Sequence, residues 1–252
     1  MKRAHIGVIG AGWWAAQNHI PLLKANPDVA IAGICGVDAE DLRRVQTTFD
    51  VPFATQDFRE LLDHKPLDGV IVSSPHVHHY EHARAAILKG CHVLVEKPFT
   101  TDAAQARELI QLEREAGITI VIPFGYNFTE MAQEAADVVR DGRLGELQHA
   151  ALHMATPTAN LFLSQTLTAT QEHLLQPNPS TWANPGGAGG FGWGQLSHAL
   201  GLLFLLVDDE ATDVFTLMRS GQSGVDLQDA ASVRFRSGAT CSLSGTSALN
   251  PA

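Results

Sequence analysis

The residues of this chain that can do chemistry begin with a glycine-rich turn near the N-terminus. The run Gly10-Ala11-Gly12-Trp13-Trp14-Ala15 follows a β-branched segment and precedes a helical one. In this G-x-G-x-x-A pattern, Gly10 allows a tight turn, Gly12 lets the backbone approach a pyrophosphate, and Ala15 permits close packing of helix on strand. A pyrophosphate there would lie at a helix N-terminus, where free N–H groups favour an anion. The pattern predicts a dinucleotide site that includes Trp13 and Trp14.

A carboxylate that binds the adenosine ribose is expected at the end of the second strand. Cys35-Gly36-Val37-Asp38 stands there, with glycine at the usual position and Asp38 two residues later. Asp38 either contacts the ribose or caps the helix that follows. Because no acid at position 36 repels a 2′-phosphate and no arginine follows directly to bind one, NAD and NADP both stay open as the cofactor.

The second chemical signal is Glu96-Lys97-Pro98, at the end of a predicted strand. The carboxyl ends of parallel strands form the edge where such sheets bind ligands. Pro98 keeps Lys97 out of the helical conformation and so holds it at the strand tip. A lysine buried near a cofactor has a lowered pKa and can donate to a substrate hydroxyl. We expect Lys97 to act on the substrate and Glu96 to lie beside the cofactor.

The third signal is a glycine-rich loop over residues 186–194 that leads into an apolar helix. Gln195 and His198 lie one turn apart on this helix and share a face. A histidine at such a helix start can serve as a general base near neutral pH, although a lone helical histidine can also be structural. Trp182, in the loop before, either stacks on a sugar ring or packs in the core.

Histidines gather in the run His76-Val77-His78-His79-Tyr80-Glu81-His82. His78 and His82 have the spacing of two metal ligands on one helix face. No distal ligand set accompanies them, and the run follows the third predicted parallel strand. We therefore predict no metal site.

Alternating strand and helix patterns in the first half must position these groups. Short apolar β-branched runs, typical of parallel strands buried on both faces, alternate with helical stretches. The expected strands are 5–10, 29–35, 69–73, 92–95 and 118–122, and the expected helices are 39–49, 58–64, 80–89 and 102–116. This alternation predicts a doubly wound α/β domain over residues 1–123.

The second half, residues 124–252, has a different construction. A helix is expected over 130–140, and strands are expected over 147–153, 214–218, 229–235 and 239–244. Residues 156–190 are polar and rich in proline, which is typical of a long functional or mobile loop. The pattern predicts an α+β domain with a mostly antiparallel sheet.

Composition excludes several classes of function. The chain has 252 residues and a formal net charge of −10, which disfavours binding to nucleic acid. No apolar run is long enough to span a membrane. Cys35, Cys91 and Cys241 are odd in number and far apart, so neither a disulfide framework nor a zinc knuckle is predicted, and a cytoplasmic location is expected.

Taken in order, these motifs resemble those of the Gfo/Idh/MocA oxidoreductase family. The glycine-rich turn is followed by Ser73-Ser74-Pro75 with His79, then by Glu96-Lys97-Pro98, by the DGRLGE run over 141–146, and by the glycine loop with His198. The resemblance spans nearly the whole chain. It implies an N-terminal Rossmann domain and a C-terminal domain with a large, mostly antiparallel sheet.

The resemblance also implies roles for single residues. Lys97 and His198 match the family positions that flank the nicotinamide and the substrate. Ser74, Pro75 and His79 match the loop that covers the nicotinamide, so we expect them to contact the cofactor.

Three family positions differ in this chain. The aspartate four residues before the histidine is Gly194, the aspartate three residues after it is Gly201, and the second family glycine is Leu196. Gln195 is therefore expected to replace the missing carboxylate in orienting the His198 ring, and to contact the substrate.

These expectations combine into an NAD(P)-dependent oxidoreductase that moves a hydride between nicotinamide and a CH–OH carbon of a sugar, inositol or related polyol. His198 would take the hydroxyl proton, and Lys97 would stabilise the alkoxide. The alternative is a dinucleotide-binding regulatory or scaffold protein without turnover, which the missing aspartates favour. Family chains usually run on past residue 252, so a truncated second domain is expected, with homo-oligomers formed through its sheet.

Overall fold

The computed structural model describes residues 3–247, and its contacts divide the chain into two compact units. The first unit comprises the chain up to Pro123 together with Leu167–Asn178. The second comprises Phe124–Thr166 and the chain from Pro179 onward. Sequence position groups residues 167–178 with the second half, whereas their contacts lie in the first unit.

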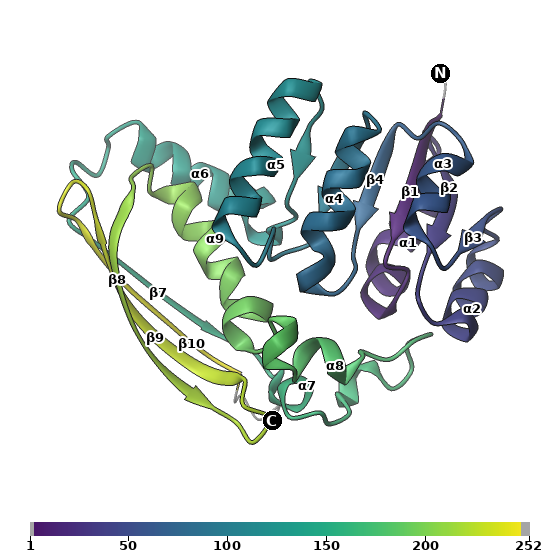
Figure 1. Cartoon of the computed structure of the whole chain (residues 1–252). Coiled ribbons are helices and arrows are strands. Elements are labelled where there is room, and N and C mark those ends of the chain that lie inside the picture. Colours follow the sequence, from purple (N-terminus) through teal and green to yellow (C-terminus); the bar gives the residue numbers. More distant parts are fainter. Residues whose placement is uncertain (1–2, 248–252) are drawn as a thin grey trace. The chain divides into compact units, whose positions relative to one another are not determined.

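The first unit is built on a six-stranded sheet in which all neighbouring strands run parallel (Figure 1). Its strands are β1 (Ala4–Ile9), β2 (Val29–Cys35), β3 (Ala54–Thr55), β4 (Gly69–Val72), β5 (His92–Val95) and β6 (Ile120–Val121). They lie in the order β3-β2-β1-β4-β5-β6. The order reverses between β1 and β4, where doubly wound sheets bind ligands at the carboxyl ends of their strands. The predicted doubly wound domain is confirmed.

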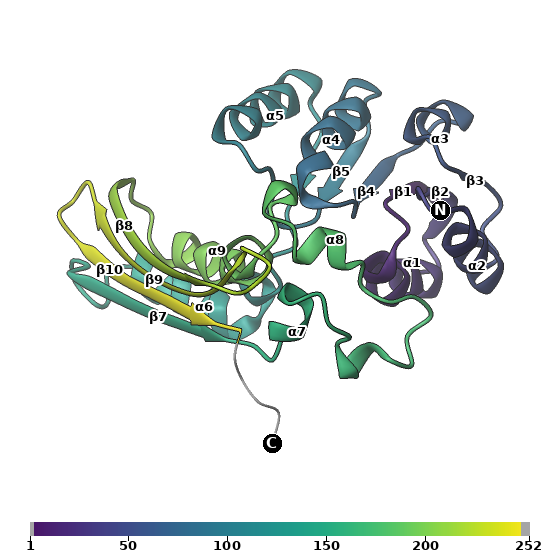
Figure 2. The ribbon, with the colours of Figure 1, turned by 60° about the horizontal axis from the view of Figure 1, so that its bottom comes forward.

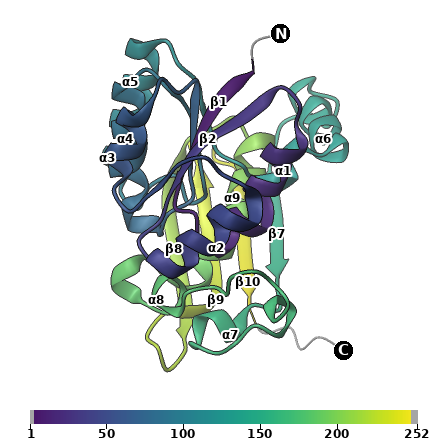
Figure 3. The ribbon, with the colours of Figure 1, turned by 90° about the vertical axis from the view of Figure 1, so that its right-hand side faces the viewer.

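Helices cover both faces of this sheet. On one face lie α1 (Ile20–Ala25), with the wide helical turn Ala15–His19 before it, and α2 (Ala39–Phe49); on the other lie α3 (Phe58–His64), α4 (His79–Leu88) and α5 (Ala103–Ala116) (Figure 3). Asp38, Asp57 and Asp102 begin α2, α3 and α5, because each carboxylate accepts an N–H of the first turn. Gly117 ends α5 with a φ of 65°, the left-handed conformation that favours glycine.

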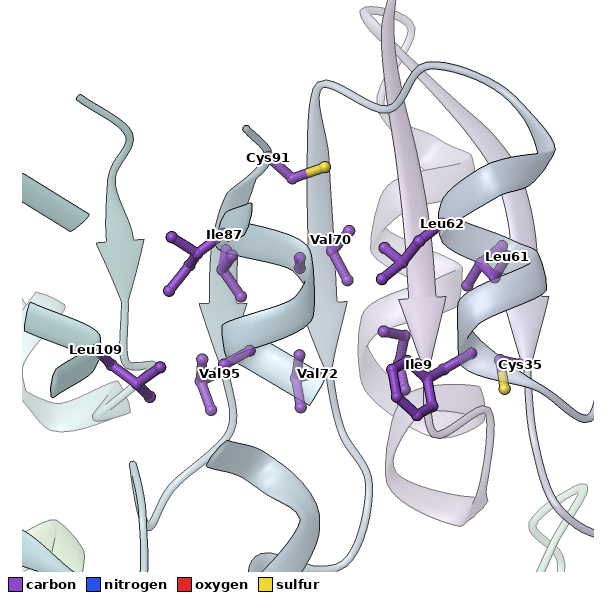
Figure 4. Close-up of a cluster of buried hydrophobic side chains, with 14 residues drawn as sticks. Ile9, Cys35, Leu61, Leu62, Val70, Val72, Ile87, Cys91, Val95 and Leu109 are labelled. Atoms are coloured by element: carbon purple, nitrogen blue, oxygen red, sulfur yellow. The ribbon is translucent and has the colours of Figure 1, made fainter. Parts of the chain in front are cut away.

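A buried cluster holds α3, α4 and α5 on the sheet. Figure 4 shows Ile87 of α4 and Leu109 of α5 beside strand residues Val70, Val72 and Val95. Each of these five side chains is at most 2% exposed. Val8, Ile31 and Ile71 are buried on the other face of the sheet. Because both faces are buried, the strands form uninterrupted apolar runs in the sequence.

The second unit contains a four-stranded sheet in the order β7-β10-β9-β8 (Figure 2). Its strands are β7 (His149–Ala155), β8 (Ala211–Ser220), β9 (Asp226–Phe235) and β10 (Thr240–Thr246). β8 and β10 both pair antiparallel with β9, while β10 and β7 pair parallel. The sheet is therefore mixed but mostly antiparallel, as predicted.

Two helices, α6 (Glu130–Arg140) and α9 (Ser197–Leu206), pack together in this unit. Phe191 and Leu203 pack on Val233 and Phe235 of β9 in a buried cluster. The region 156–190 contains the short helices α7 (Ala159–Phe162) and α8 (Pro179–Trp182). Across residues 3–247, no helix is both long enough and apolar enough to cross a lipid bilayer.

Candidate active site

The glycine-rich turn directly follows β1. Gly10 has a φ of 89°, and a Cβ there would collide with the backbone N of Ser74, so the turn requires glycine. At Gly12 a Cβ would meet nothing within 4 Å. This open space lies at the start of a helix, where backbone N–H groups can bind a pyrophosphate. The residues present therefore fit a dinucleotide cofactor.

Two side chains of the helix that follows this turn hold the carboxylate of Glu96. Trp14 Nε1 donates to Glu96 Oε1 at 2.7 Å, and His19 Nε2 lies 2.7 Å from the same oxygen. Burial acts to raise the pKa of Glu96, but His19, Lys97 and the Trp14 hydrogen bond together hold that pKa below its ordinary value. The ionised carboxylate ties the glycine-rich turn to the end of β5. No sequence motif includes His19. The one signal that could have identified it is its position on the helix that follows the glycine-rich turn.

Lys97 lies at the tip of β5 and is 7% exposed. Burial lowers the pKa of its amine, and the charge of Glu96 opposes part of that lowering. Its backbone N–H donates to Glu96 Oε2 at 3.1 Å, so the second carboxylate oxygen also fixes the chain here. Such an amine exchanges a proton with a substrate hydroxyl more readily than an exposed lysine does.

His79 lies between two loops and has no exposed surface. Its Nδ1 is 2.7 Å from the Pro98 carbonyl oxygen and its Nε2 is 2.8 Å from the Ser74 carbonyl oxygen. Burial lowers the pKa of His79, and the two carbonyl contacts oppose that effect. The ring therefore links the loop that carries Ser74 and Pro75 to the Glu96-Lys97-Pro98 loop.

Two other histidines of the run, His76 and His82, contact His79 and the loop that carries Ser74. His76 is buried with its ring edge toward His79, and His82 Nδ1 lies 2.8 Å from Ser74 Oγ. Burial, with the charge of His78 second, lowers the pKa of His82 to about 4. In the part of the chain that the structure describes, no three His, Cys, Asp or Glu side chains are grouped as metal ligands.

Asp38 takes the capping position at α2. Its Oδ1 accepts the backbone N–H of Asp41 at 2.9 Å. Of the two roles that the sequence leaves open for Asp38, the helix cap is the one seen in the structure. Gly36 lies near Ala11 of the glycine-rich turn, with its would-be Cβ 3.9 Å from that residue.

In the second unit, His198 lies in the first turn of α9 against two aromatic rings. The ring centroids of Phe124 and Tyr126 are 6.4 Å and 5.9 Å from that of His198, and both pairs meet edge to face. Gln195 is half-buried, one turn before His198. The sequence does not point to the aromatic residues, because they are far from His198 along the chain.

Aromatic rings also fill the space at the two glycines that stand where the family pattern has aspartate. A Cβ on Gly194 would lie 3.1 Å from the ring of Trp182, and one on Gly201 would lie 2.6 Å from the ring of Phe124. A carboxylate at either position would displace these rings. Trp182 itself packs edge to face on Phe162, with ring centroids 6.4 Å apart.

A pair of carboxyl groups from β9 lies beside the glycine loop that precedes α9. Asp226 Oδ2 accepts the backbone N–H of Gly192 at 2.5 Å. Asp229 is 5% exposed, and its carboxyl group lies within hydrogen-bond reach of that of Asp226. Burial, and then the charge of Asp226, raise the pKa of Asp229 to about 7.

Replacing Asp229 with asparagine is expected to raise the free energy of unfolding near pH 8 by about 1–3 kcal/mol. The asparagine amide can donate to Asp226, and no charge is buried. The pKa of Asp229 is about 7 in the folded protein against an ordinary 3.8, so the parent loses stability as the pH rises from the lower value to the higher. The Asn variant lacks this loss.

Urea unfolding at about pH 5 and about pH 8 measures this difference. Asp213→Asn is the matched control, because Asp213 lies on the neighbouring strand β8 with its side chain 67% exposed. A parent and an Asp229→Asn variant whose stabilities change equally between the two pH values would contradict the prediction.

Comparison with known proteins covers both units. Residues 4–124 match a model described as an oxidoreductase family with an NAD-binding Rossmann fold, and residues 132–252 match the GFO/IDH/MocA C-terminal domain. A dTDP-3,4-didehydro-2,6-dideoxy-alpha-D-glucose 3-reductase of Streptomyces antibioticus is 35% identical over 150 residues, which are 58% of this chain and 44% of that protein. A D-glucoside 3-dehydrogenase of Escherichia coli is 29% identical over 142 residues, 56% of this chain and 40% of that protein. The aligned stretches therefore cover less than half of either relative.

Solved structures share the fold. A scyllo-inositol dehydrogenase from Lactobacillus casei with bound NAD(H) and scyllo-inositol has a TM-score of 0.78 at 18% identity, over 96% of this chain and 69% of that chain. A myo-inositol 2-dehydrogenase from Lactobacillus plantarum has a TM-score of 0.78 at 16% identity, over 97% and 70%. The two family models together match nearly the whole sequence, which confirms the resemblance that the motifs carry. The chain belongs to the Gfo/Idh/MocA family of oxidoreductases, with an N-terminal domain of the NAD-binding Rossmann fold.

Proposed function

We propose that the protein is an NAD(P)-dependent oxidoreductase acting on a CH–OH group of a sugar, inositol or related polyol. The observation that carries the proposal is the buried Lys97 amine at the end of β5, joined through Glu96 to the glycine-rich turn. Relatives named as a deoxysugar reductase and a D-glucoside dehydrogenase support the class of substrate.

In the proposed mechanism, written for oxidation of the CH–OH carbon, a nicotinamide cofactor would when bound accept the hydride from that carbon. The backbone N–H groups after Gly10 would hold its pyrophosphate. Lys97 donates a hydrogen bond to the substrate oxygen and stabilises the charge that develops there. His198 accepts the hydroxyl proton, and Glu96 holds the chain at Lys97 in place.

One observation favours a second candidate, a dinucleotide-binding protein without turnover. The rings of Trp182 and Phe124 occupy the space that carboxylates would need at Gly194 and Gly201. Both positions are glycine, so the carboxylates of the family pattern are missing at these two places. A regulatory or scaffold protein would need the glycine-rich turn but not these carboxylates.

Turnover separates the two candidates. We expect the chain to reduce NAD⁺ or NADP⁺ in the presence of at least one member of a panel of inositols, aldoses, glucosides and deoxysugars, measured as absorbance of the reduced nicotinamide. The reverse reaction, reduction by NADH or NADPH, is measured with sugars that carry a ketone at a ring carbon. Tight cofactor binding with no turnover in either direction would favour the non-catalytic protein.

We expect two copies of the chain to associate through the sheet of the second unit. The strand β8 exposes Val214, Phe215, Leu217 and Met218, each by about two-thirds of its surface. Phe215 and Leu217 pair with Ser232 and Ala230 of β9, which are also exposed, so they share one face of the sheet.

Sedimentation velocity at micromolar concentration should show a dimer that the double variant Phe215→Glu/Leu217→Glu converts to a monomer, because charge on this face opposes its burial. Thr212→Glu, on the same strand and exposed, is the control. A parent that sediments as a monomer would overturn the proposed association.

A further inference from the structure

The segment Leu167–Asn178, here named the strap, packs on the first unit although it belongs to the sequence of the second half. Leu175 is 3% exposed and lies in the same buried cluster as Ala11, Ala15 and Leu42. Arg44 of α2 donates to the carbonyl oxygen of Leu174 at 2.5 Å. In Figure 2 the strap is the green stretch between α7 and α8, and it runs beside α1 and α2. A buried leucine and a backbone hydrogen bond thus anchor the strap on the dinucleotide-binding unit.

The strap reaches the glycine-rich turn through His173. Trp13 Nε1 donates to His173 Nδ1 at 2.8 Å, and the two rings lie side by side with centroids 6.2 Å apart and planes inclined by 16°. An indole N–H can only donate, so His173 Nδ1 presents its lone pair to Trp13. Trp13 directly follows Gly12, so its backbone N–H belongs to the set that faces a bound pyrophosphate.

We propose that the strap retains the cofactor and that His173 is a positioning residue for the cofactor site. By holding the Trp13 side chain, His173 keeps the turn in the shape that binds a dinucleotide. This inference rests on the proposed function, because it requires a dinucleotide at the turn.

The places where the strap is attached match the path of such a cofactor. In a doubly wound sheet the pyrophosphate lies at the turn after β1, and the adenosine lies toward the end of β2. The strap contacts Trp13, which lies in the turn after β1 where the pyrophosphate is expected. It also contacts Arg44 of α2, the helix that follows β2, near the expected adenosine. Loosening of the Trp13–His173 contact therefore accompanies release of the cofactor, and the intact contact slows that release.

The test measures how fast the reduced cofactor leaves the full chain, by stopped-flow displacement with an excess of its oxidised form; NADH is used, or NADPH if the parent binds that cofactor more tightly. His173→Ala is expected to raise the dissociation rate constant by up to about tenfold, the effect of one lost hydrogen bond. His173→Gln keeps an amide oxygen that can accept from the indole, and it restores most of the slow release. Gln171→Ala is the matched control, since Gln171 is an exposed side chain of the same strap.

Two further readouts separate positioning from a general loss of structure. The double variant Trp13→Phe/His173→Ala should release NADH no faster than either single variant, because both remove the same bond. The thermal unfolding of His173→Ala should stay as cooperative as that of the parent, and the rate of hydride transfer in a single turnover should stay unchanged in the control Gln171→Ala, whose side chain is exposed.

The outcomes are distinguishable. If the parent binds NADH and His173→Ala releases it at the parent rate, the role of the strap is overturned and the proposed function stands. An equal acceleration in His173→Ala and His173→Gln also overturns it, because the hydrogen bond would then have no part. A parent that binds neither NADH nor NADPH overturns the proposed function itself.

Discussion

Alanine in place of Lys97 is expected to lower kcat by about 10²–10⁴-fold, the usual contribution of a positioned proton donor or acceptor, which equals about 3–5 kcal/mol of activation free energy. The buried amine, whose pKa burial lowers, is the group that meets the substrate oxygen in the proposed mechanism. The dissociation constant for NADH should change by no more than about threefold, because the pyrophosphate binds at the glycine-rich turn. Steady-state kinetics and a fluorescence titration measure the two quantities.

Lys89→Ala is the matched control for this experiment. Lys89 is an exposed lysine that pairs with Asp63 just before β5, and its loss should leave kcat within about twofold. An added primary alkylamine should restore part of the activity of Lys97→Ala by placing an ammonium group in the vacated space. Full activity of Lys97→Ala without the amine would remove Lys97 from the mechanism.

Valine in place of Gly12 is expected to weaken NADH binding by at least about 100-fold, or about 2.7 kcal/mol of binding free energy. A Cβ at Gly12 meets nothing within 4 Å, so the protein should fold normally while the side chain occupies the space of the pyrophosphate. Fluorescence titration with NADH measures the binding, and a thermal melt verifies the fold.

Two other glycines make this test specific. Gly125 also has open space around its would-be Cβ, and Gly125→Val should bind NADH like the parent. Gly10 is unsuitable, because its φ of 89° and the nearby backbone of Ser74 mean that any side chain disturbs the turn itself. A Gly12→Val variant that binds NADH as tightly as the parent would place the cofactor elsewhere.

Local sequence signals predicted the elements of the first unit closely. The predicted helices over 39–49 and 58–64 have the bounds of α2 and α3, and the predicted strands over 29–35 and 92–95 have those of β2 and β5. Capping aspartates and continuous apolar runs are properties of neighbouring residues, so they can be read without the fold. The two-residue β3 is too short to carry such a signal.

The candidate site was predictable only where a motif is continuous in the chain. The glycine-rich turn predicts where a pyrophosphate binds, and the Glu96-Lys97-Pro98 tripeptide predicts the lysine at the strand tip. Their connection through Trp14, and the support of both loops by the buried ring of His79, join residues that are distant in sequence. Spacing along one chain carries no information about such pairs.

By itself, then, the sequence determined the alternation of strands and helices, the turn that fits a pyrophosphate, and the lysine at the tip of β5. These features depend on backbone conformation and on burial patterns that repeat over a few residues. Only the tertiary structure decided that Glu96 is shared by Trp14 and His19, that rings of Trp182 and Phe124 stand against Gly194 and Gly201, and that residues 167–178 pack on the first unit. Each of these depends on which distant segments are folded against one another, because burial, pKa and hydrogen-bond partners are properties of the packed surroundings of a side chain.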